Sequence, residues 1–81
     1  MEKLIDKFLM HLETEKNYSL KTVDTYKFNL EVFSLFLKKE HINYKKITYL
    51  ELRQYVIYLY NKNLSKKSIS QHISTVKSFF N

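Results

Sequence analysis

The chain of 81 residues contains no glycine and no proline. These residues are the commonest helix breakers and the usual residues of tight hairpin turns, so their absence favours helices joined by short polar loops. It also excludes the glycine-rich loops that bind the phosphates of nucleotides. The sequence therefore predicts an all-α protein, and its length limits it to one small domain.

Apolar residues recur at helical spacing in four segments. We predict helices over about residues 2–16, 20–39, 49–62 and 66–80. The residues expected to face inward are Leu4, Ile5, Phe8, Leu9 and Leu12, then Val23, Tyr26, Leu30, Phe33 and Leu37, then Leu52, Tyr55, Val56 and Leu59, and finally Ile69, Ile73, Val76 and Phe80.

The segment over residues 20–39 is apolar on a second side as well, through Phe28, Val32, Leu35 and Phe36. A helix that is hydrophobic all round is normally buried on several sides. We therefore expect this helix to be central and largely covered. Only its first two turns are expected to present a polar face.

Polar residues mark where three of the helices begin. Ser19 and Ser65 each precede a periodic segment, and a serine hydroxyl there can accept a free amide of the first turn. Thr48 is followed three residues later by Glu51, which indicates a capping box. Residues 40–47 are predicted to form a basic connector.

The net charge is +6, and the excess lies in one half of the chain. Residues 1–40 hold seven basic and seven acidic side chains, whereas residues 41–81 hold seven basic side chains and only Glu51. A one-sided basic surface indicates a polyanionic partner such as nucleic acid. Ordinary solubility charge is the alternative explanation.

The polar face of the segment 66–80 contains no carboxylate. At about 100° per residue, its side chains opposite the apolar stripe are Lys67, Gln71, Ser74 and Ser78. Short hydroxyls permit close approach to DNA, glutamine can read an adenine edge, and lysine can contact guanine or phosphate. The pattern favours a helix that enters the DNA major groove over a serine-rich helix facing only solvent.

Two further positions carry candidate contacts. The first turns of the segment 20–39 offer free amides and a helix dipole that favour phosphate, although simple N-terminal capping explains the same residues equally well. His72 lies near the edge of the apolar stripe, where packing is the preferred interpretation and a phosphate contact the alternative. The candidate DNA-binding residues are Lys21, Thr22, Thr25, Lys66, Lys67, Ser68, Gln71, His72, Ser74 and Lys77.

Other classes of site have little support. There is no cysteine, and isolated histidines and scattered carboxylates do not form a metal cluster or a nucleophile–base pair. We expect no catalytic residue, metal, cofactor or small-molecule substrate. No apolar run approaches the roughly 20 residues that span a bilayer, and the charged MEKLIDKF is unlike a signal peptide, so a cytoplasmic protein is expected.

Several patterns occur in a distinctive order. LIDKFLMHLETEKNYS is followed by Ser19, Thr22, Tyr26, Leu30 and Phe33, then by Thr48 and Leu52, and finally by LSKKSI and KSFF. In these features the chain resembles the N-terminal core-binding domain of tyrosine recombinases, the Xer-type and phage-integrase family. It departs from the family pattern at Asn63, where glycine is usual, and at Asn29, where an acidic residue is frequent.

This resemblance implies a four-helix SAM-like bundle over residues 1–81, with its second and fourth helices in the major groove of a recombination half-site. Lys67, Ser68 and Gln71 would then approach bases or phosphates, His72 a phosphate, and the family's contacts in the second helix would fall on Lys21, Thr22 and Thr25. These positions coincide with the polar faces identified above.

The resemblance also implies what lies outside the sequence. The family's tyrosine nucleophile and its Arg, Lys and His partners belong to a separate C-terminal domain, which is absent here. The parent protein would be a DNA strand-transferring recombinase that works as a tetramer on double-stranded DNA, whereas the isolated domain is expected to be a monomer. A helical protein-interaction module and a standalone DNA-binding regulator remain the alternatives.

Overall fold

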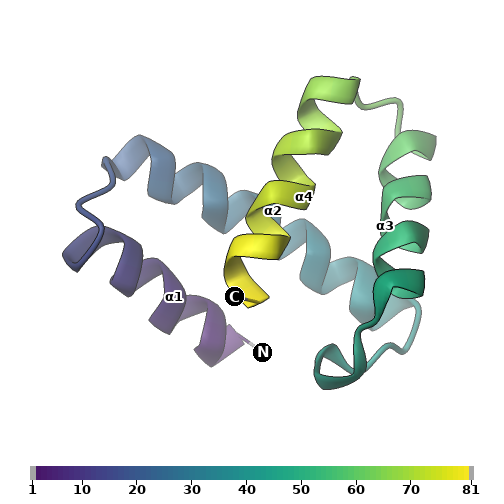
Figure 1. Cartoon of the computed structure of the whole chain (residues 1–81), viewed down its shortest axis with the longest axis horizontal. Helices are drawn as coiled ribbons and strands as arrows, with labels where there is room; N and C mark the ends of the chain where they lie inside the picture. The colour runs from purple at the N-terminus through teal and green to yellow at the C-terminus, as the bar shows by residue number, and fades with distance from the viewer. Residues whose placement is uncertain (1, 81) are drawn as a thin grey trace.

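The computed structural model describes residues 2–80, which form four α-helices and no strand. The elements are α1 (Glu2–Thr14), α2 (Leu20–Lys39), the 3₁₀ turn η1 (Tyr44–Lys46), α3 (Tyr49–Asn61) and α4 (Lys66–Phe80) (Figure 1). The predicted all-α, four-helix architecture is confirmed. The bounds of α2 and α4 agree with the prediction, whereas α1 and α3 end slightly earlier and the basic connector contains η1.

α2 is the central helix, as predicted. It packs against α1, α3 and α4, and α4 crosses in front of it (Figure 1). Val23 near its start and Leu30 at its middle form an apolar cluster with Ile5, Leu9 and Leu12 of α1. The second half of α2 joins a larger cluster with α3 and α4, made of Phe33, Phe36, Leu37, Tyr55, Leu59, Ile69 and Val76.

Tyr55 anchors α3 in this larger cluster. Its ring centroid lies 4.9 Å from that of Phe33 and 5.0 Å from that of Phe36. Its hydroxyl is buried and has no hydrogen-bond partner among the described residues. Burial, and secondly the nearby Tyr58, raise the pKa of the Tyr55 hydroxyl, so this group stays neutral.

The predicted N-terminal caps are present. The Ser19 Oγ accepts the Thr22 amide at 3.3 Å, and the Ser65 Oγ accepts the Ser68 amide at 3.2 Å. At the start of α3 the Thr48 amide donates to the Glu51 Oε1 at 3.2 Å. The caps satisfy amides that have no partner within the helix and fix where each helix begins.

The helices end without glycine because other residues adopt positive φ there. Asn17, His41 and Asn63 have φ of 54°, 55° and 63°. After α2 the amide of Ile42 donates to the Leu37 carbonyl at 2.9 Å, which is a Schellman-type closure around His41. Asparagine tolerates this backbone region well, so Asn63 forms the turn without a glycine.

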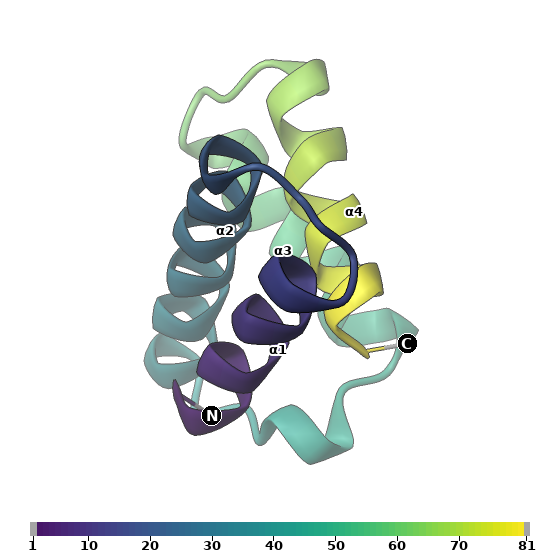
Figure 2. The same cartoon turned by 90° about the vertical axis from the view of Figure 1, so that its left-hand side faces the viewer.

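The prediction that α2 is largely covered is correct only in part. Phe28 is 61% exposed and Leu35 is 63% exposed, although Phe36 is buried and Val32 is half-buried. α1 and α4 lie on the same side of α2, so the opposite side of this helix stays in solvent (Figure 2). Phe28 lies at the margin of the seam with α4, where one side of its ring contacts His72 and the rest is exposed. Three residues predicted to face inward are exposed as well, namely Leu4, Val56 and Phe80.

A buried polar pair joins α2 to α4. The Asn29 Nδ2 donates to the Thr75 Oγ1 at 3.0 Å, and this hydroxyl donates in turn to the Gln71 carbonyl at 3.0 Å. Asn29 is 2% exposed and Thr75 is 0% exposed, so Thr75 belongs to the buried side of α4 although it was not among the residues expected to face inward. Because a buried polar group is costly without its partner, this pair selects one register of α4 on α2.

We expect the pair to be energetically coupled. Thr75→Val leaves the Asn29 amide without an acceptor and should lower the free energy of unfolding by about 1–3 kcal/mol. Asn29→Leu combined with Thr75→Val replaces both polar groups by apolar ones and should cost less than the sum of the two single changes. Urea unfolding followed by circular dichroism measures all four proteins. Strict additivity of the two single changes would contradict a coupled pair.

Candidate nucleic-acid interface

The N-terminal halves of α2 and α4 enclose a groove of about 640 Å³. α2 contributes one wall and α4 contributes the other. Leu64, which belongs to the α3–α4 loop, also lines the groove. The lining residues are Lys21, Asp24, Thr25, Phe28, Asn29, Leu64, Ser68, Gln71 and His72. Since Asn29 belongs to the buried pair with Thr75, the groove lies beside the point where the two helices are tied together.

Five of the ten candidate residues meet in this groove: Lys21, Thr25, Ser68, Gln71 and His72. They come from two helices that are far apart in the sequence. Lys21 and Gln71 are exposed, whereas Thr25 and Ser68 are half-buried. The Thr25 hydroxyl donates to the Lys21 carbonyl at 3.0 Å, so its proton is directed toward its own helix. The groove therefore offers a lysine and a glutamine at its exposed margins.

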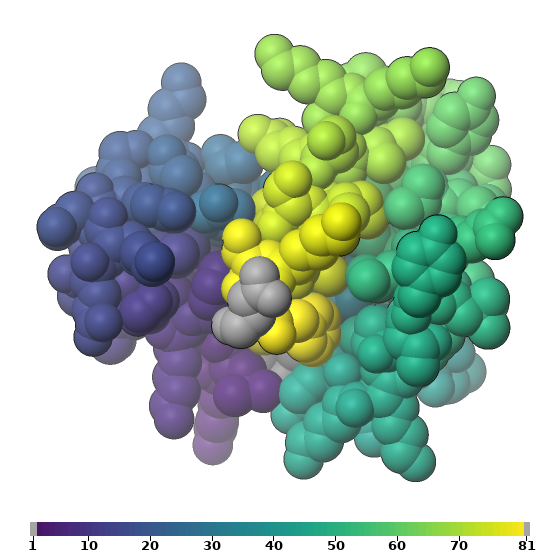
Figure 3. All heavy atoms as spheres, viewed as in Figure 1, coloured from purple at the N-terminus to yellow at the C-terminus, as the bar shows by residue number. Residues whose placement is uncertain are grey.

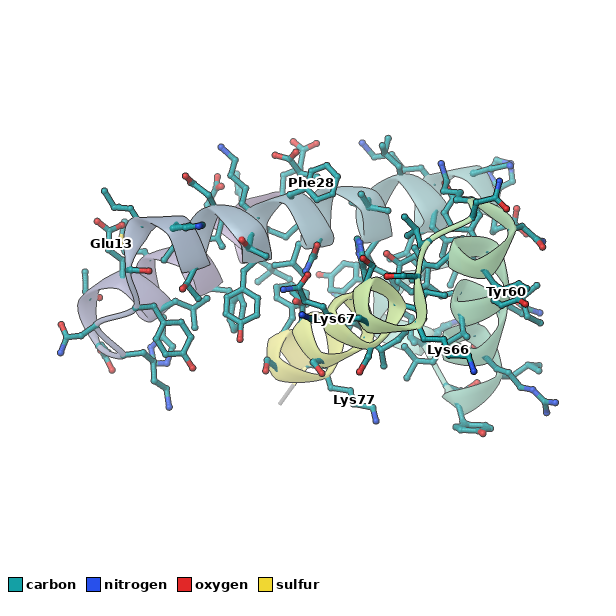
Figure 4. The ribbon with its side chains drawn as sticks, turned by 90° about the horizontal axis from the view of Figure 1, so that it is seen from above. Glu13, Phe28, Tyr60, Lys66, Lys67 and Lys77 are labelled. Atoms are coloured by element: carbon teal, nitrogen blue, oxygen red, sulfur yellow. The ribbon has the colours of Figure 1, made fainter. Side chains whose placement is uncertain are left out.

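The other five candidates lie outside the groove lining. Thr22 is exposed at the start of α2, where its hydroxyl is 3.0 Å from that of Ser19. Three more are exposed on α4, namely Lys66, Lys67 and Ser74. Lys77 points away from α2 and lines a separate hollow beside Tyr44 and Phe80 (Figure 4). Lys77 is thus separated from the groove residues by the width of α4.

Sequence reasoning missed four residues of the groove: Asp24, Phe28, Asn29 and Leu64. A signal was present for the three on α2. Lys21, Thr25 and Phe28 follow the three- and four-residue spacing of one helical stripe, with Asp24 and Asn29 beside it. From the sequence, Phe28 was placed on the second apolar side of the helix and Asn29 was noted only as a departure from the family pattern. Neither residue was considered beside Lys21 and Thr25.

The positive charges of α4 have no acidic partners among the described residues, whereas the α2 wall of the groove carries Asp24 as well as Lys21. Within residues 2–80 Lys38 forms an ion pair with Glu2 at 3.6 Å, and the His11 imidazole lies 3.5 Å from the Glu15 carboxylate. No lysine of α4 forms an ion pair among these residues. The prediction of a carboxylate-free face holds for α4, but Asp24 adds a negative charge to the opposite wall. The positive field therefore arises from α4 and from the first turn of α2.

The outer surface of α4 is open to solvent. Figure 3 shows its atoms, coloured green to yellow, across the middle of one face between α1 and α3. Lys66 and Lys67 lie at the N-terminal end of this surface (Figure 4). A partner could approach along the length of α4 without displacing another helix.

His72 is more buried than its helical-wheel position predicts. Its side chain lies in the seam between α2 and α4, is 5% exposed, and has an Nδ1 atom without a hydrogen-bond partner among the described residues. Its ring centroid is 6.2 Å from that of Phe28, with the planes tilted by 59°. This burial favours the packing interpretation of His72 over a phosphate contact. Burial lowers the pKa of the His72 imidazole below its ordinary value.

Comparison with known proteins agrees with this architecture. The profile of the family described as phage integrase, N-terminal SAM-like domain, matches residues 5–81. The chain therefore belongs to this family of SAM-like integrase domains. The resemblance expected from the Ser19–Phe33 pattern and from LSKKSI is confirmed.

Several curated proteins that resemble the chain are named tyrosine recombinase XerC. The chain is 41% identical to tyrosine recombinase XerC of Staphylococcus saprophyticus over 80 residues and 40% identical to tyrosine recombinase XerC of Oceanobacillus iheyensis over 81 residues. It is 36% identical to tyrosine recombinase XerC of Staphylococcus aureus strain JH9 over 80 residues. Each match covers 99% of this chain and 27% of the relative, so the chain spans about a quarter of their length. No solved structure matches the chain.

The described part of the chain has neither a metal-binding cluster nor a membrane-spanning helix. Residues 2–80 contain no group of three or more His, Asp or Glu side chains arranged to hold a metal ion. None of the helices they form has the length and apolar character needed to cross a membrane.

The burial of His72 predicts a pH-dependent stability. The unfolded chain, with an ordinary histidine pKa of about 6.5, binds a proton more readily than the folded protein does, so stability should fall as the pH drops below that value. One such proton can lower the free energy of unfolding by at most about 1.4 kcal/mol per pH unit. Urea unfolding at several pH values between 7.5 and 5 measures the loss.

Two variants isolate the contribution of His72. His72→Leu removes the titrating group and should flatten the profile below pH 6.5, whereas His41→Asn removes an exposed imidazole, retains a residue suited to positive φ, and should leave the loss in place. An unchanged slope in His72→Leu would show that another group is responsible.

Proposed function

We propose that this domain binds double-stranded DNA at a recombination half-site, as the N-terminal clamp domain of a tyrosine recombinase. The observation that carries the proposal is the groove between α2 and α4, bordered by a carboxylate-free helix whose lysines have no ion-pair partner within residues 2–80. Membership of the integrase family supports the same function.

The exposed face of α4 suits the DNA major groove. An α-helix with its side chains is about 10–12 Å wide, close to the major-groove width of about 12 Å. Ser74 and Ser68 on α4 are short enough to allow close approach. Gln71, at the groove margin, can pair with an adenine edge, and Lys67 can reach a guanine or a phosphate.

The start of α2 suits a phosphate. Lys21 is exposed at a helix N-terminus, where the dipole and free amides favour an anion. The hydroxyls of Thr22 and Thr25 already contact Ser19 and the Lys21 carbonyl. Lys21 is therefore the principal phosphate contact that we assign to α2, with the two threonines shaping the surface around it.

The parent protein would supply the chemistry elsewhere. We propose that residues 1–81 form the core-binding domain and that the catalytic tyrosine and its cationic partners lie in a separate C-terminal domain. The greater length of the XerC relatives supports this division. The parent recombinase would then close around DNA with both domains and act as a tetramer, while this domain contributes binding and no catalytic residue.

A protein-interaction module is the second candidate function. The observation that favours it is an exposed apolar stripe on α3, in which Tyr49, Ile57 and Tyr60 share one side of the helix. This stripe and the groove belong to different helices. Variants on each surface therefore distinguish the two functions.

We expect Lys67 and Gln71 to affect DNA binding in different ways. Lys67→Ala should weaken binding to all duplexes and reduce by about one the slope of log affinity against log salt, because one phosphate contact is lost. Gln71→Ala should cost about 1–3 kcal/mol on the preferred site and relax its sequence preference, with little change in the salt slope. Titration of fluorescently labelled duplexes at several salt concentrations measures both effects.

Arg53→Ala provides the matched control, because it removes an exposed positive charge on α3. It should leave affinity and salt slope close to those of the unmodified domain. The proposed function would be wrong if no duplex bound at low salt. It would be wrong as well if Arg53→Ala weakened binding while Lys67→Ala and Gln71→Ala did not.

A further inference from the structure

We infer, on the basis of the proposed function, that Phe28 contacts the 5-methyl group of thymine and makes the groove selective for A·T base pairs. Phe28 lies on the wall of the groove and is 61% exposed. It is the one aromatic carbon ring in a lining that is otherwise mostly polar. Most of the Phe28 side chain is therefore available to contact a partner and contributes little to the core.

The position of Phe28 relative to the proposed DNA contacts supports this assignment. Lys21, Thr25 and Phe28 are spaced by four and three residues, so they lie along one side of α2. Gln71 lines the opposite wall of the same groove. A duplex that brought a phosphate to Lys21 and base edges to Gln71 would bring the edges of its base pairs toward Phe28.

Phe28 is positioned by one ring contact and by the helical turn that carries it. Its tilted contact with the buried His72 supports one side of the ring. The next residue, Asn29, is fixed by its hydrogen bond to Thr75, which holds this turn of α2 against α4. Phe28 thus combines an exposed apolar surface with a defined position, so little conformational freedom is lost on contact.

The chemistry of the major groove selects the ligand. Base edges there present hydrogen-bonding groups and one apolar group, the methyl of thymine. A phenylalanine can approach that methyl but cannot satisfy a donor or an acceptor. Insertion of an aromatic wedge between base pairs is typical of proteins in the minor groove, and α4 is too wide to enter it. Gln71 can read adenine, so both walls would favour the same base pair.

Replacement of thymine by deoxyuridine tests this contact, because the two bases differ only by the methyl group. A duplex is first selected from a randomised library with the unmodified domain, and is then synthesised with either base. The unmodified domain should bind the deoxyuridine duplex about fourfold more weakly, the factor that corresponds to one buried methyl group. Phe28→Ala should bind the thymine and the deoxyuridine duplex with equal affinity. That affinity should not exceed the affinity of the unmodified domain for the deoxyuridine duplex.

Leu35→Ala is the matched control, because Leu35 is equally exposed on α2 and lies outside the groove lining. It should retain the preference for thymine. Thermal unfolding should confirm that both variants fold, as expected for exposed positions.

The outcomes separate this inference from the proposed function. If the unmodified domain binds duplex DNA but does not distinguish the two bases, or if Phe28→Ala still distinguishes them, the inference fails and the proposed function stands. If the unmodified domain binds no duplex at low salt, the proposed function fails and the inference fails with it.

Discussion

The hydrogen bond from Asn29 to Thr75 fixes where α4 crosses α2, and the rest of the structure follows from that crossing. The pair lies where the two apolar clusters meet, since Leu30 beside Asn29 belongs to one cluster and Val76 beside Thr75 belongs to the other. Apolar contacts alone would allow α4 to slide, because they are non-directional. A single buried polar pair penalises every register in which the two groups do not meet, and it thereby sets the width and lining of the groove.

The same crossing determines which side chains are available for a partner. It brings Lys21 and Gln71 onto facing walls, buries His72 in the seam and leaves Phe28 exposed beside it. It also turns the lysines at the start of α4 toward solvent, away from the ion pairs of α1. The groove is therefore a product of helix packing, and no segment of the sequence forms it alone.

Local features could be predicted from the sequence because they depend on neighbouring residues. The caps at Ser19 and Ser65, the positive φ at Asn63 and the starts of α2, α3 and α4 follow from side chains within a few positions. Residues at the crossing could not be predicted in the same way. Periodicity gives the direction of a side chain from its own helix axis, but not which neighbour covers it, so the burial of Thr75 and His72 and the exposure of Phe28 were missed. The role of Asn29 could not be predicted from its neighbours, because its hydrogen-bond partner is 46 residues away.

Backbone amide NMR of the labelled domain, titrated at low salt with a mixed-sequence DNA duplex, tests most directly whether the α2–α4 groove is the DNA-binding surface. We expect the largest chemical-shift changes in residues 20–29 and 66–74, which form the two walls of the groove and the exposed face of α4. Residues 49–61 of α3 should change little. The assignment would be contradicted if the largest chemical-shift changes fell on α3. It would also be contradicted if no chemical shift changed at low salt with the duplex in large excess over the domain.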